Sequence, residues 1–134
     1  MCKNFDTVSY FDHAEYLKMF DIISNDNGEF AKEDLEAVDD ALTQCRNYVN
    51  VVDTTEQQIM LAGVRFEGEQ FREMVTRYDT QRRHAHEAAI ASANMLNRIS
   101  NMYGCQTIYK GSEDRLEVAD FCLEVTVALF QNRR

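Results

Sequence analysis

The chain contains no proline in 134 residues, and this absence is the strongest constraint that the sequence places on its fold. Proline lacks an amide hydrogen and clashes with the preceding helical turn, so helix interiors exclude it. The turns of β and α/β folds, in contrast, use proline often. The length corresponds to a single domain. The sequence therefore predicts an all-α fold, with one helical domain over residues 1–134.

Apolar spacing and turn-forming residues divide the chain into four predicted helices. We expect them at about 6–23, 30–52, 54–103 and 113–130. Asparagine and glycine at 24–28 form the first turn, and the sequence at 53–56 resembles a capping box that begins the third helix. Gly104 ends that helix. The fourth helix has two adjacent apolar rows, which predict a largely buried helix. Short connections predict an antiparallel four-helix bundle.

The length of the predicted third helix has a consequence for assembly. Its apolar residues keep heptad spacing from Leu61 to Tyr103. One helix over 54–103 would be roughly 75 Å long at ~1.5 Å per residue, and the shorter helices could not cover it. The uncovered seam would need a second copy of the chain, so we expect a homodimer. The alternative is a break near Asp79, where a new cap would give five helices.

Composition narrows the classes of partner and compartment. The net charge is −9, and the acidic excess lies in residues 1–64. Phosphate contacts require clustered cations, so we expect neither nucleic acid nor an anionic membrane as partner. The sequence has no apolar run that would span a membrane and no apolar leader, which predicts a cytoplasmic protein. The four cysteines are widely spaced, so we expect reduced thiols rather than disulfides or a zinc site.

One helical turn and a half gathers Arg82, Arg83 and His86. Arginine forks suit phosphate and carboxylate groups, so an anion or nucleotide site over Arg82–Glu87 is one functional alternative. The other interpretation is a solvated face on which charges pair along the helix, as Arg83 would with Glu87 at a spacing of four.

Three asparagines follow on one stripe, at Asn94, Asn97 and Asn101. Asparagine inside a helix is less favourable than alanine by up to about 0.7 kcal/mol. The stripe therefore suggests hydrogen bonds across an interface or to a ligand. Small residues over 85–93 would let another helix approach closely. We expect this stretch to be a contact surface, the alternative being an ordinary polar face.

The segment 20–35 resembles the EF-hand family. Asn25 and Asn27 fit the third and fifth places of a calcium loop, and Asp34 stands where the bidentate glutamate belongs. Ile23 occupies the first place and offers no oxygen, so Asp21 would have to serve in a lengthened loop. The resemblance implies Ca²⁺ binding over residues 21–34 as a second functional alternative. The other interpretation is a simple connection between two helices.

Residues 82–90, followed by Leu96-Asn97-Arg98, are similar to small all-helical bacterial proteins of unknown function. This resemblance implies a cytoplasmic bacterial origin and supplies no activity. The sequence as a whole predicts a small helical interaction or regulatory protein that self-associates through its third helix. We expect no catalytic activity, no cofactor and no metal outside the EF-hand alternative; a further protein partner is compatible with this prediction.

Overall fold

The computed structural model describes residues 9–131, which form four α-helices. They are α1 (His13–Ser24), α2 (Ala31–Arg65), α3 (Gly68–Met102) and α4 (Arg115–Thr126), and α4 continues as a π-helical segment at Val127–Gln131. Over the described range there is no strand, and Phe11 and Tyr109 form an isolated β-bridge. The helices pack against one another, so the predicted all-α fold with four helices is confirmed.

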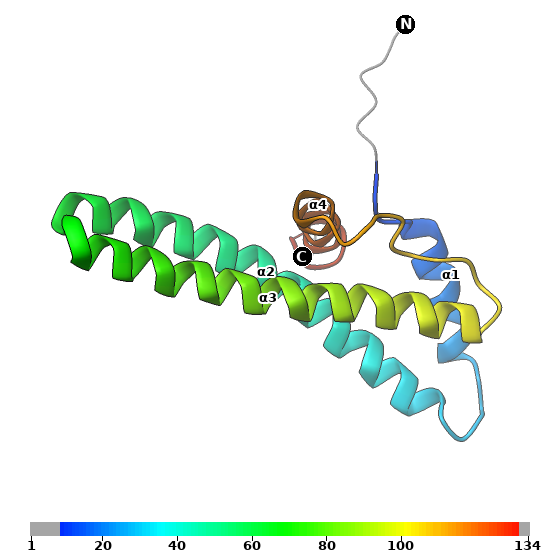
Figure 1. Cartoon of the computed structure of the whole chain (residues 1–134). Helices are drawn as coiled ribbons and strands as arrows, with labels where there is room; N and C mark the ends of the chain where they lie inside the picture. Colours follow the sequence, from blue (N-terminus) through cyan, green and yellow to red (C-terminus); the bar gives the residue numbers. More distant parts are fainter. Residues whose placement is uncertain (1–8, 132–134) are drawn as a thin grey trace, which may run out of the picture.

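α2 and α3, each 35 residues long, form an antiparallel hairpin that is the longest feature of the molecule (Figure 1). The predicted single helix over 54–103 is wrong, because the chain reverses at 66–67. Gly68, with φ of 63°, adopts the left-handed conformation that glycine tolerates best. α3 then continues through Asp79, so the alternative break there does not occur. It ends before Gly104, whose φ is 78°, as predicted.

The predicted capping box at 53–56 lies inside α2 instead of beginning a helix. The hydroxyl groups of Thr54 and Thr55 donate to the carbonyl oxygens of Asn50 and Val51, at 2.8 and 2.5 Å. This bonding to the preceding turn satisfies both hydroxyls within a continuous helix. The second helix therefore runs on to Arg65 rather than ending near residue 52.

The start of α1 also differs from the prediction. Asp12 caps the helix by accepting a hydrogen bond from the Glu15 amide at 3.0 Å. The preceding residues are extended, and the Asp12 amide donates to the Ile108 carbonyl oxygen at 2.9 Å. The predicted start near residue 6 lies outside the described residues. Pairing with the loop at 105–111 therefore replaces the expected first helical turn.

α1 turns a different face inward from the expected one. Apolar spacing predicts a buried stripe that includes Leu17, Phe20 and Ile23. Ile23 is buried, but Leu17 and Phe20 are 51% and 43% exposed, and Tyr16 and Met19 are buried in their place. The two sets are offset by about one residue around the helix, and helical periodicity alone does not distinguish them when both are apolar.

The core lies where α1, α4 and the loop after α3 meet the hairpin. α4 contributes Val118, Phe121, Cys122 and Val125, all at 0% exposure. Its second apolar row, which includes Leu123, faces solvent, so the prediction of a largely buried helix is correct for one row and wrong for the other. The small residues of α3 are mostly inside this core, where they let the neighbouring helices approach closely. They are Ala85, Ala89, Ser92 and Ala93.

Three cysteines are free thiols buried in the core, at Cys45, Cys105 and Cys122. A hydrogen bond with the Cys45 thiol, together with burial, raises the pKa of the Cys122 thiol. Cys122 therefore stays protonated and packs as a small hydrophobic residue. Cys2 lies outside the described residues.

The distal part of the hairpin extends beyond the other helices, and we call residues 57–83 the arm (Figure 1). The hydrophobic core and the side chains packed against it include no residue between Val52 and Ala85. The arm is therefore held by contacts between α2 and α3 alone. We call the remaining described residues the body.

Gly63, within the arm, gives a test of local packing. A Cβ atom at this position would lie 3.6 Å from Cε1 of the Phe71 ring, an ordinary van der Waals distance. Glycine in a helix interior is about 0.8–1 kcal/mol less favourable than alanine. We expect Gly63→Ala to raise the free energy of unfolding by roughly 0.5–1 kcal/mol in chemical denaturation. A lower free energy of unfolding would show that the two helices cannot accept the methyl group.

Candidate interaction surface

Arg82 links the two helices of the hairpin where the arm joins the body. Its Nε donates to the Thr55 hydroxyl oxygen at 2.7 Å, and its Nη2 donates to the Val52 carbonyl oxygen at 3.4 Å. Thr55 itself is 2% exposed. Arg83, in contrast, is exposed. The structure therefore separates the two arginines that the sequence grouped as an anion site.

His86 lies one turn after Arg82 and packs against Tyr48, with 5.7 Å between the ring centroids. Its Nε2 atom is buried and forms no hydrogen bond within residues 9–131. Burial raises the pKa of Tyr48, and Arg115 and Arg82 partly oppose that shift. Polar residues in a helix seam fix which positions of the two helices pair. The bonds of Arg82 to Thr55 and Val52 therefore help to fix the alignment of α2 against α3.

Of the three asparagines in the stripe, Asn97 forms a partly buried set of hydrogen bonds and the other two are exposed. Asn97 Oδ1 accepts from the amides of Ile108 and Tyr109 at 2.7 and 2.8 Å, and its Nδ2 donates to the Tyr109 carbonyl oxygen at 3.1 Å. Asn94 and Asn101 are exposed. The predicted hydrogen bonds of Asn97 exist, but they hold a loop of the same chain rather than a ligand.

Candidate calcium ligands in the EF-hand-like turn form hydrogen bonds with other residues of the chain. Asn25 Nδ2 donates to the Asp21 carbonyl oxygen at 2.9 Å and to its Oδ1 at 3.2 Å. Asp34 Oδ2 accepts from the Tyr103 hydroxyl at 2.6 Å, and Asn27 is exposed in the turn. Within residues 9–131 no group of three or more His, Cys, Asp or Glu side chains is arranged to hold a metal ion. The turn thus joins α1 to α2, and Asp34 ties α2 to the end of α3.

Two tyrosines give the folded chain a distinct alkaline titration. The hydrogen bond to Asp34 raises the pKa of Tyr103 to about 12, and burial raises the pKa of Tyr109 to about 12. The ordinary pKa of tyrosine is 10.0, so folding favours the protonated phenols. Their contribution to stability is complete below pH 10 and is lost as the pH rises through 12.

We therefore expect Tyr103 and Tyr109 to be the last tyrosines to ionise in phenolate absorbance, and the free energy of unfolding to fall over that range. Tyr103→Phe should remove one of the late ionisations and leave the other. Ionisation of all tyrosines together near their ordinary pKa, in a chain still folded by circular dichroism, would contradict this assignment.

The arm carries the most exposed apolar side chains of α2. Val64, Met60 and Leu61 are 85%, 68% and 51% exposed, and they lie within one and a half turns. Sequence spacing assigned Leu61 and Val64 to the buried seam, but Ala62 faces α3 instead. Several larger apolar residues of the arm are only half-buried. They are Ile59, Phe66, Phe71, Met74, Val75 and Tyr78.

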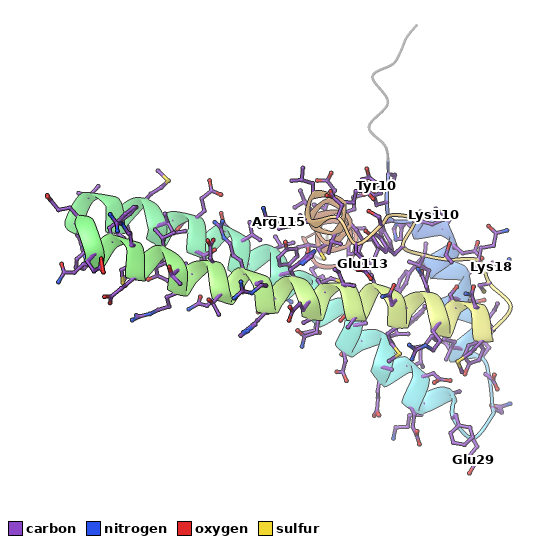
Figure 2. All side chains as sticks on the ribbon, viewed as in Figure 1. Tyr10, Lys18, Glu29, Lys110, Glu113 and Arg115 are labelled. Carbon is purple, nitrogen blue, oxygen red and sulfur yellow. The ribbon has the colours of Figure 1, made fainter. Side chains whose placement is uncertain are left out.

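Charge separates the arm from the body. Residues 57–83 contain five arginines and four acidic residues, a net charge of +1 in a chain whose total is −9. Two arms that met would therefore experience little net repulsion. Figure 2 shows the side chains of the arm surrounding a two-helix ribbon, with the labelled residues of the body well away from its tip.

A family model described as "Protein of unknown function (DUF3232)" matches residues 8–134. The chain belongs to this family. No curated protein and no solved structure matches it. The matched residues include 57–83, so the arm of this chain lies inside the family region. The family match agrees with the resemblance of residues 82–98 to proteins of unknown function. No helix in the described part of this DUF3232 domain is both long and apolar enough to cross a membrane.

Proposed function

We propose that this protein is a helical interaction protein that self-associates through the arm. The observation that carries the proposal is the exposure of Val64, Met60 and Leu61 on a two-helix extension that lies outside the hydrophobic core. In this arrangement two arms pack into an intermolecular four-helix bundle. The role is one of binding and includes no catalytic step.

Helix packing explains why an arm of this kind favours a partner. In a two-helix hairpin each helix buries only the stripe that faces its neighbour. A four-helix bundle gives every helix two neighbours and encloses a common core. Removing a Val or Leu side chain from water contributes about 1.5–3 kcal/mol when burial is complete. The half-buried residues Phe71 and Met74 of α3 would be covered by the same association.

The charge of the arm supports a second copy rather than a strongly charged partner. In a two-fold symmetric dimer the same patch lies on both chains, so its own charge decides whether the copies repel. Arginines and acidic residues are interspersed over 57–83, and their net charge is +1. The body, which carries the acidic excess, lies away from the tip of the arm (Figure 1).

Light scattering coupled to size-exclusion chromatography tests the proposal at tens of micromolar protein. We expect twice the mass of one chain for the unmodified protein, and the mass of a single chain for Val64→Asp and Leu61→Asp. Leu17→Asp is the matched control, because Leu17 on α1 is 51% exposed, as is Leu61. It should leave the dimer intact.

Circular dichroism of each variant checks that the body remains folded. A clean monomer for the unmodified chain would reject self-association. Equal dissociation by Leu17→Asp and Leu61→Asp would reject the arm as the interface.

A further inference from the structure

A second exposed apolar surface lies on α4, on the body. Leu116, Leu123 and Val127 are 74%, 48% and 43% exposed. Spacings of seven and four residues place them along one side of the helix. This is the apolar row that does not enter the core, and it is separate in sequence and in space from the arm (Figure 1).

A groove of about 360 Å³ runs between this side of α4 and α2. Its apolar lining includes Val49, Val52 and Leu123. Carboxylates from both helices also line it, namely Asp53, Glu56 and Asp120. None of these three forms an ion pair with another residue of the range 9–131.

Neighbouring charges leave this groove acidic. Glu117 and Glu124 of α4 already accept hydrogen bonds, from Ser112 and from the segment at 9–10. Two arginines act on Tyr48 at the groove, Arg115 at the start of α4 and Arg82 of α3. Arg115 and Arg82 do not balance the three carboxylates.

We infer that this groove binds an amphipathic helix of a partner protein, with an apolar face and a basic face. The apolar side chains of the helix pack on Val49, Val52 and Leu123. Its lysines or arginines meet the three carboxylates. A groove between two helices accepts the side-chain ridge of a third, and helix-in-groove recognition uses anchors at helical spacing.

Charge favours this occupant over a second copy of the chain. The acidic excess of the protein lies outside the arm, so a second body placed here would bring like charges together. Like-charged surfaces disfavour association, whereas opposite charges across an interface raise the association rate and the specificity. The site is independent of the arm, which leaves dimerisation and helix binding separable by experiment.

The test uses two synthetic amphipathic helical peptides with the same leucine face. One carries lysine and arginine on its polar face, and the other carries glutamate. Fluorescence anisotropy with the full chain measures their affinities. We expect the basic peptide to bind at least about tenfold more tightly, a difference of about 1.4 kcal/mol, and to lose affinity as salt increases.

Variants locate the binding site. Two variants should each lower the affinity for the basic peptide at least about tenfold. Leu123→Asp removes the apolar contact, and the combined change Asp53→Lys, Glu56→Lys and Asp120→Lys removes the opposite charges. Leu17→Asp, at an exposed leucine of α1, should change nothing. Equal binding of the two peptides, or full binding to Leu123→Asp, would overturn the inference. A change of oligomeric mass in Leu123→Asp, with Val64→Asp unaltered, would assign the groove to a second copy instead.

Discussion

Replacing Asn97 by alanine is expected to lower the free energy of unfolding by about 2–4 kcal/mol, measured by chemical denaturation. The change removes the acceptor of two backbone amides in the loop after α3. Those amides belong to Ile108 and Tyr109, which are 0% and 6% exposed. A buried amide left without an acceptor costs about 1–3 kcal/mol, because it has lost water without gaining another bond.

Two further substitutions separate this hydrogen-bonding effect from helix propensity. Asn94→Ala lies one turn earlier on the exposed side of α3 and should be neutral or stabilising by up to about 0.7 kcal/mol. Asn97→Asp keeps the oxygen that accepts from both amides and loses the donor to the Tyr109 carbonyl oxygen. Its effect should fall between those of the unmodified chain and Asn97→Ala. If Asn97→Ala and Asn94→Ala behaved alike, the amide of Asn97 would not hold the loop.

Phe121→Ala is the second large effect, with an expected loss of about 3–5 kcal/mol in the free energy of unfolding. Phe121 is 0% exposed, and its ring lies 4.6 Å from that of Tyr109 and 5.8 Å from that of Phe11, between centroids. One side chain therefore joins α4 to the loop after α3 and to the segment before α1. Deleting it leaves a cavity that three elements would have to close.

Leu116→Ala is the control on the same helix, since Leu116 is 74% exposed. It should change stability by no more than about 0.5 kcal/mol. If Phe121→Ala does not fold, Phe121→Leu retains part of the contact and should show a smaller loss in the same measurement. If Phe121→Ala lowered the free energy of unfolding no more than Leu116→Ala does, Phe121 would not be a central residue of the core.

Local sequence signals predicted the helices better than they predicted how the helices pack. The turn at 24–28 and the end of α3 at Gly104 each have a residue whose backbone preference marks it. The reversal before Gly68 carries the same signal, but the heptad spacing of Leu61, Val64 and Phe71 runs across it. Apolar periodicity shows which side of a helix is apolar, but it does not show the direction of the chain. Two antiparallel helices were therefore predicted as one continuous helix.

The candidate residues show the same limit at the level of single side chains. The unfavourable helix propensity of Asn97 correctly marked it as a residue with a structural role, but the loop residue that it holds lies eleven residues later, in a segment without a periodic pattern. Arg82 was grouped with Arg83 as an anion site, because its acceptor on the opposite helix, the Thr55 hydroxyl, cannot be inferred without the hairpin. The groove on α4 was missed because both apolar rows of that helix satisfied the pattern of a buried face.

The confinement of the arm to two helices makes its length adjustable. No core residue lies between Val52 and Ala85, so the body does not depend on how far the hairpin extends. Removing one heptad from each helix, on the two sides of the 66–67 turn, would shorten the arm by about 10 Å and keep the facing stripes aligned. If two chains associate through their arms, as proposed, such a deletion would shorten the distance between their bodies and leave the fold of each body unaltered.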